Sequence, residues 1–200
     1  MTTATVIGMA LLTVRVYGAT TAPGSDYQSS LAEAHRIVRR AGITLQWLRC
    51  DSGPAGPVTQ CAEQLGPDEV ILRIADSGRR PAGEVVSMGF SLIDRDQAAP
   101  ARFSTVWVDR VHSMATRAGA DPGRLLGRAI AHELGHLLLN DTTHSRTGLM
   151  RAGWTVPELR RNAGRDWQFE TTDAYRMRAA LTSRARRPPG APSAESVSRE

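Results

Sequence analysis

Hydrophobic and polar positions along this chain follow two different periods. Alternating or continuous apolar residues bounded by turn residues predict strands at residues 6–17, 43–47, 69–75, 85–93 and 102–109. Apolar residues at helical spacing over 27–41 predict a helix, and Gly42 ends it where a left-handed residue is favoured. The first half of the chain therefore predicts a sheet with one helix inserted.

The second half is predicted to be mainly helical. Asp121 is a favoured N-cap, and Pro122 suits the first position of a helix that runs to Asn140. A short helix near 157–163 and a last helix over 172–183 follow. This order predicts an α/β or α+β domain with the long helix packed on a sheet. We expect one domain over 1–185 and a disordered tail over 186–200, which offers no residue larger than valine to bury.

The long helix carries the sequence His132-Glu133-Leu134-Gly135-His136. Residues four apart share one helix face, so both imidazoles can bind the same zinc ion at about 2.0–2.1 Å. Glu133 is poorly placed as a ligand but can act as the general base for a water activated by zinc. The alternative is a helix that exposes these three side chains to water. Apolar neighbours argue against it, because burying the three without a partner is costly.

A catalytic zinc needs a third protein ligand and an open position. His144 is the best candidate, because the short polar stretch after Asn140 lets the chain reverse and return to the metal. Asp141 and Glu158 are rival ligands. We expect the remaining histidines, His35 and His112, to be ordinary surface or core residues.

The stretch HELGHLLLNDTTHSRTGLM resembles the metal-binding segment of the metzincin metallopeptidases, and most closely an uncharacterised bacterial subgroup. The resemblance covers most of residues 11–183 and implies zinc ligands at His132, His136 and His144, with Glu133 as the base. It also implies that Met150 occupies the Met-turn under the metal.

The implied fold is a mixed, twisted sheet of about five strands beside the long active-site helix. A C-terminal subdomain, mostly irregular and ending in a helix, is implied from about residue 141. The strand at 85–93 would form the upper edge of the cleft.

Three positions depart from the usual metzincin pattern. Leu139 stands where glycine is expected, His144 comes two residues late, and Arg151 replaces a tyrosine that some members carry after the Met-turn. These departures concern the third ligand and the subfamily, and they leave the first two ligands and the base intact.

Two cysteines, Cys50 and Cys61, flank a Gly/Pro-rich loop that can bring its ends together. A disulfide there favours a secreted or extracytoplasmic protein. The alternatives are two unpaired thiols, or Cys50 as an inhibitory ligand of the metal. No segment reaches the length of a membrane span, and the apolar run at 6–14 lacks the flanks of a signal peptide. We therefore expect any export signal to lie upstream.

The formal net charge is +5, and all 25 basic residues are arginine. They are spread along the chain, with the densest group at 176–187, which favours a solvated helix face and basic tail over a nucleic-acid site. We expect a monomeric zinc-dependent endopeptidase whose partner is a peptide or protein, with no nucleic acid and no membrane bound. The alternative is a secreted, catalytically inactive binding module that contains zinc.

Overall fold

The computed structural model describes residues 10–19, 21–51, 59–77, 87–94 and 99–186. Its centre is a five-stranded sheet in the order β2-β1-β3-β5-β4. The strands are β1 (Ala10–Tyr17), β2 (Ile43–Arg49), β3 (Glu69–Ala75), β4 (Gly89–Leu92) and β5 (Phe103–Trp107). Four strands run parallel, whereas β4 pairs antiparallel with β5 at the end of the sheet. The expected α/β fold with a mixed sheet of five strands is confirmed.

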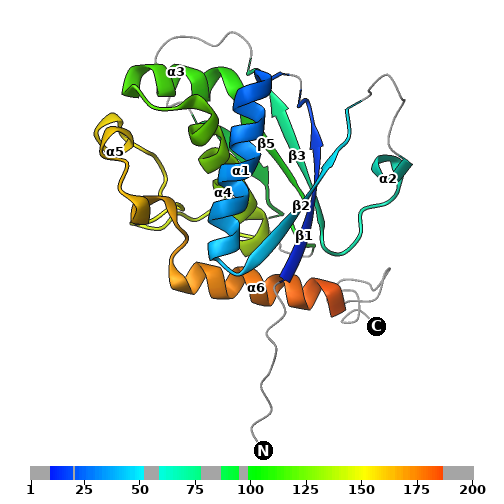
Figure 1. Cartoon of the computed structure of the whole chain (residues 1–200). Helices are drawn as coiled ribbons and strands as arrows, with labels where there is room; N and C mark the ends of the chain where they lie inside the picture. Colours follow the sequence, from blue (N-terminus) through cyan, green and yellow to red (C-terminus); the bar gives the residue numbers. More distant parts are fainter. Residues whose placement is uncertain (1–9, 20, 52–58, 78–86, 95–98, 187–200) are drawn as a thin grey trace, which may run out of the picture.

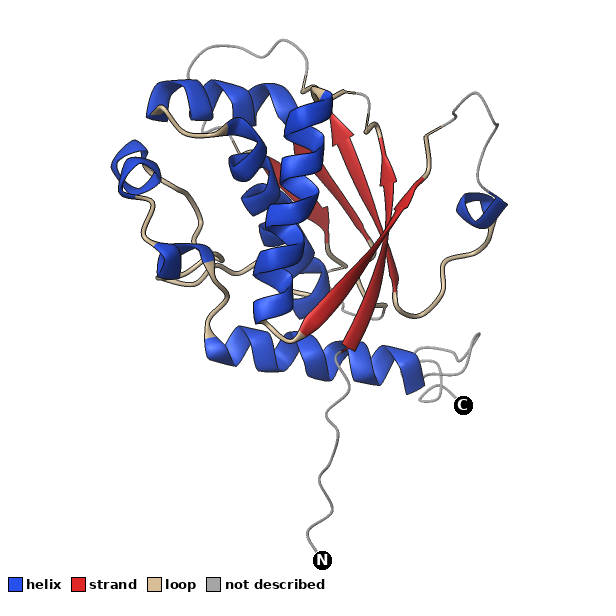
Figure 2. Ribbon diagram, viewed as in Figure 1, coloured by secondary structure: helices blue, strands red, loops and turns tan. Residues whose placement is uncertain are grey.

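The helices are α1 (Gly24–Arg40), α2 (Thr59–Ala62), α3 (Val108–Ala118), α4 (Pro122–Leu139), α5 (Val156–Arg161) and α6 (Thr171–Arg186), with a 3-10 turn at Gly164–Trp167. Helices α1 and α4 pack together against one face of the sheet, and α6 crosses the end of both the sheet and α4 (Figures 1 and 2). Fully buried side chains such as Leu12, Ile37 and Ile130 join these layers. No helix of the described residues is long and apolar enough to cross a membrane.

The helix that carries the candidate site begins and ends where the sequence predicts. The Asp121 carboxylate accepts a 2.6 Å hydrogen bond from the Arg124 backbone N–H. Asn140 ends α4 in the left-handed region at a φ of 52°. Every residue of α4 from Leu125 to Leu138 is buried. The helix is therefore the centre of the core, and its polar motif is enclosed by apolar packing.

Residues 61–68, which lead from Cys61 to β3, lie against the face of the sheet away from α4. Cys50 and Cys61 form a disulfide with their Cα atoms 5.6 Å apart, as expected, which rules out Cys50 as a metal ligand. The Arg15 guanidinium of β1 donates to the backbone carbonyl of Glu63 at 2.7 Å and pairs with the Glu69 carboxylate at 2.5 Å. These contacts hold residues 61–69 on the side of the sheet away from α4.

Several predicted boundaries are wrong. Strand β5 ends at Trp107, and α3 begins at once, where the sequence predicts strand up to residue 109 and no helix. No turn residue separates the two elements, so the apolar run of the strand hides the helix start. Helix α1 begins three residues early at Gly24, and α6 includes Arg186 from the expected tail. The strand predicted at 85–93 is the shorter β4, and residues 85–86 lie outside the described part of the chain. Residues 187–200 of the predicted tail also lie outside it.

Candidate metal centre

His132 and His136 lie one turn apart on α4 and are only 9% and 6% exposed. Their Nε2 atoms face each other at 3.0 Å. The Nδ1–H of His132 donates to the Leu149 carbonyl at 2.9 Å, and the Nδ1–H of His136 donates to the Asp141 carbonyl at 2.7 Å. A carbonyl only accepts, so each ring has its proton on Nδ1 and a lone pair on Nε2. Two lone pairs pointing at each other call for a cation between them.

Burial keeps these imidazoles neutral, which a metal ligand requires. Burial, helped by the charge of His136, lowers the pKa of His132 to about 3. The pKa values of His136 and His144 are also lowered, mainly by burial. Neutral imidazole at pH 7 leaves the nitrogen lone pairs available for a metal.

The chain after α4 turns back and brings His144 to the same point. The candidate ligand atoms of His132, His136 and His144 all lie within 4.8 Å of one another. The His144 ring stacks against His132 at 5.4 Å and meets His136 edge-on at 4.8 Å. His144 is exposed, so one side of the cluster opens outward. Three neutral imidazole nitrogens with an open side form a donor set that fits a catalytic zinc.

The rival ligands are used elsewhere. The Asp141 carboxylate accepts from the backbone N–H of Thr143 at 2.9 Å. Glu158 caps α5 through the Thr155 backbone N–H at 2.7 Å. Of the other histidines, His112 pairs with Asp26 at 3.1 Å, and neither it nor His35 belongs to the cluster.

Met150 packs against α4 at Gly135 and is 1% exposed. A Cβ atom added to Gly135 would lie 2.5 Å from the Met150 sulfur, so glycine is what lets the methionine approach α4 this closely. A 2.9 Å hydrogen bond from the Ser145 N–H to the Met150 carbonyl joins the two ends of the turn over residues 145–150. Its neighbour Leu149 supplies the carbonyl that orients His132.

Glu133 points from α4 towards the edge strand β4 and is 5% exposed. The Ser91 hydroxyl donates to its Oε2 atom at 2.7 Å. Burial raises the pKa of Glu133 to about 7, against the opposing effect of the Ser91 hydrogen bond. Gly89 lies beside the same carboxyl, where an added Cβ would come within 2.7 Å of Oε1. Such a carboxyl can both accept and return a proton near neutral pH.

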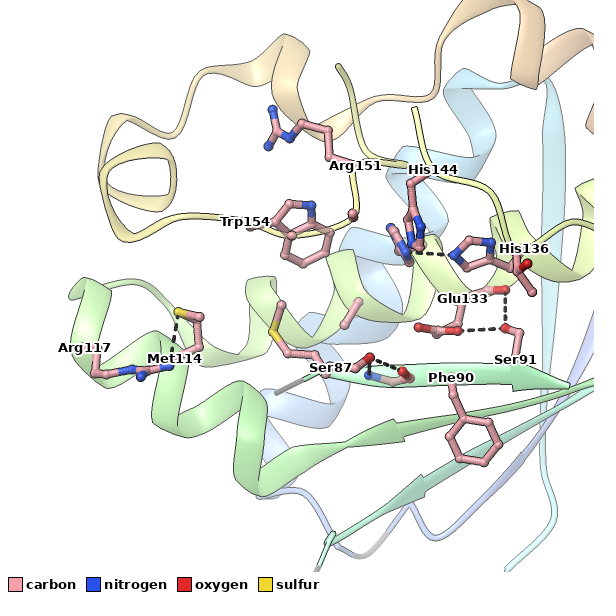
Figure 3. Close-up of a pocket in the computed structure, with 17 residues that line it drawn as sticks. Ser87, Phe90, Ser91, Met114, Arg117, Glu133, His136, His144, Arg151 and Trp154 are labelled. Carbon is pink, nitrogen blue, oxygen red and sulfur yellow. Dashed lines mark hydrogen bonds between the residues drawn. The ribbon is translucent and has the colours of Figure 1, made fainter. Parts of the chain in front are cut away.

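The histidines and Glu133 open into a cleft of about 610 Å³ (Figure 3). One wall is β4 with the residues just before it, and the opposite wall is the segment after α4 up to Trp154. Within the described residues, β4 pairs with β5 alone, so its other edge is free along this cleft. An extended chain can add to such an edge through main-chain hydrogen bonds.

The fold has a counterpart among solved structures. The chain is similar to archaemetzincin from Methanopyrus kandleri, with a TM-score of 0.53 and 15% identity over 88% of this chain and 97% of that chain. The fold is archaemetzincin-like. At this identity the likeness concerns the fold alone. No protein-family model matches the sequence. No curated protein matches it either.

In this archaemetzincin-like fold, the site includes residues that the sequence did not reveal. Ser91 and Gly89 lie on β4, more than 40 residues before Glu133, and no motif marks them. Trp154 packs edge-on against His132 at 5.7 Å. The carbonyl contacts of Leu149 and Asp141 come from the backbone, so their residue types carry no signal.

Proposed function

We propose that the protein is a zinc-dependent endopeptidase with Glu133 as its general base. The observation that carries this proposal is the convergence of three neutral imidazoles, from His132, His136 and His144, at the wall of an open cleft beside the Glu133 carboxyl. A purely structural zinc site favours four closed ligands and has no need of a neighbouring carboxylate.

His132, His136 and His144 would hold the zinc ion. When bound, zinc supplies a Lewis acid that polarises a substrate carbonyl and makes water more acidic. Glu133 takes a proton from the attacking water and passes it to the leaving amine. Ser91 holds the Glu133 carboxyl in place, and the free edge of β4 aligns an extended peptide along the cleft.

The second candidate is a catalytically inactive, secreted binding module that retains zinc. Both candidates would be extracytoplasmic proteins. The Cys50–Cys61 disulfide is compatible with an extracytoplasmic location and supports both candidates equally. Glu133 separates the two, because a carboxyl beside the ligands serves catalysis rather than zinc retention.

The test combines metal analysis with a peptide-library assay on the wild type and on Glu133→Gln. The proposal expects one zinc per chain in both proteins, with cleavage by the wild type alone and its loss on treatment with a chelator. Equal cleavage by both proteins would remove Glu133 from the mechanism. Zinc without cleavage by the wild type would favour the binding module.

A further inference from the structure

The cleft continues beyond the metal centre towards helix α3. Figure 3 shows Met114 and Arg117 on the far side of Trp154 from His136 and His144. Met88 and Ala129 line the same cavity. Among the described residues, this part of the cleft is therefore walled by apolar groups, with the cation of Arg117 at its end.

Arg117 differs from the other arginine that lines the cleft. Arg151 is paired with Glu158 at 3.6 Å and lies over the Trp167 ring at 5.6 Å. The Arg117 guanidinium instead contacts the Met114 sulfur at 3.7 Å, and no carboxylate among the described residues forms an ion pair with it. Its side chain is exposed, so its charge is available to a ligand.

The acidic residue that lines the cleft is on β4's side of the histidines, not beside Arg117. Glu133 is the one carboxyl among the lining residues that the structure describes, and it is engaged by Ser91. A carboxylate entering between Met114 and Trp154 would meet the Arg117 cation, and no lining residue that the structure describes there is acidic. The planar guanidinium can bind it through two parallel hydrogen bonds.

We propose that this part of the cleft selects substrates with a carboxylate close to the cleaved bond, and that Arg117 determines this specificity. The apolar walls accept a short aliphatic stem, and the guanidinium binds the carboxylate at its end. A glutamate side chain and the C-terminal carboxylate of a short peptide share this chemistry. The inference rests on the proposed endopeptidase function and adds its substrate class.

The test uses peptides that differ in one residue beside the cleaved bond, either Glu, Gln or Lys, each with a free or an amidated C-terminus. We expect wild-type kcat/KM to favour Glu over Gln by about tenfold, the effect of one hydrogen bond to a charged group. Arg117→Glu should reverse the preference towards Lys. A preference that follows the free C-terminus rather than Glu would assign the site to the chain end.

Two further variants keep the result interpretable. Arg117→Met removes the charge but retains an unbranched stem, and it should abolish the preference. Arg124→Glu makes the same change in charge as Arg117→Glu on an exposed part of α4 that does not line the cleft, so its preference should match the wild type.

Binding separates this inference from the proposed function. Calorimetry on Glu133→Gln should show tighter binding of the Glu peptide than of the Gln peptide, and loss of that difference in Glu133→Gln/Arg117→Met. An enzyme that cleaves and binds the Glu and Gln peptides equally overturns the role of Arg117. If Glu133→Gln binds the Glu peptide more tightly but the wild type cleaves neither peptide, the carboxylate-binding role of Arg117 is supported and the endopeptidase proposal is wrong.

Discussion

The Ser91 hydroxyl donates a 2.7 Å hydrogen bond to Oε2 of Glu133 and so joins the edge strand β4 to helix α4. The same oxygen of Ser91 lies 3.1 Å from the backbone carbonyl of Glu133. The strand proposed to align the substrate therefore also holds the proposed base, and the two parts of the site share one side chain.

Ser91→Ala should lower kcat with little change in zinc content. The Glu133 carboxyl would lose one hydrogen bond to a charged group, worth about 1.5–3 kcal/mol, which corresponds to a rate loss of about 10- to 100-fold. Steady-state kinetics and metal analysis measure both effects. Ser91→Thr keeps the hydroxyl and should recover part of the rate. A Ser91→Ala enzyme as fast as the wild type would show that the hydrogen bond has no role in catalysis.

Zinc should stabilise protein that has been stripped with a chelator. At a free zinc concentration of 100 times the dissociation constant, binding to the folded state adds about 2.7 kcal/mol, or about 5–10 °C in Tm for a chain of this size. His144→Ala should reduce this shift because it removes one of the three clustered imidazoles. The matched control is His35→Ala, outside the cluster, and calorimetric melting gives the readout. A full shift in His144→Ala would exclude His144 as a ligand.

Gly135→Ala should destabilise the packing around Met150. The added Cβ would lie 2.5 Å from the Met150 sulfur and 2.7 Å from a ring carbon of Phe169. Overpacking of this kind costs about 1–3 kcal/mol. Urea unfolding measures the change. Gly164→Ala, where nothing lies within 4 Å of the added atom, should be near neutral. Equal stability of both variants would show that Met150 moves aside without cost.

Stability should fall in acid as Glu69 takes up a proton. Burial alone would raise the pKa of Glu69, but hydrogen bonds from the Gly66 backbone and the Arg15 guanidinium outweigh it and hold the pKa below its ordinary value of 4.5. A group with a lowered folded pKa stabilises the protein above its unfolded pKa, and that contribution disappears as the pH falls through the folded value.

The measurement is the free energy of unfolding of the wild type and of Glu69→Gln between pH 7 and pH 2. The variant should be less stable at pH 7, and the gap should narrow below about pH 4.5. A constant gap across this range would mean that ionisation of Glu69 contributes nothing to stability.

What the sequence predicted well was local. The cap at Asp121, the turn at Asn140 and the His132–His136 spacing depend on residues within a few positions, so the sequence predicted α4 and its motif. Helix α3 was missed because Trp107 and Val108 continue an apolar run across the change from strand to helix. The contact between Ser91 and Glu133 depends on which strand lies at the edge of the sheet, and no local pattern encodes that position.

The position of His144 could be predicted only in part from the sequence. Its part in the cluster was predicted from the need for a third ligand, and the structure brings its ring within 5.4 Å of His132. The turn at Asn140 comes one residue later than the glycine of the metzincin pattern, which accounts for one of the two extra residues before His144.

Three contacts of residues 141–150 with the histidine cluster limit how many residues this segment can contain. One end supplies the carbonyl that orients His136, the middle supplies His144, and the far end supplies the carbonyl that orients His132. A single insertion or deletion here would displace at least one of these three groups, whereas most loops tolerate such changes. Among chains that share the two extra residues before His144, we therefore expect this segment to vary in sequence more readily than in number of residues.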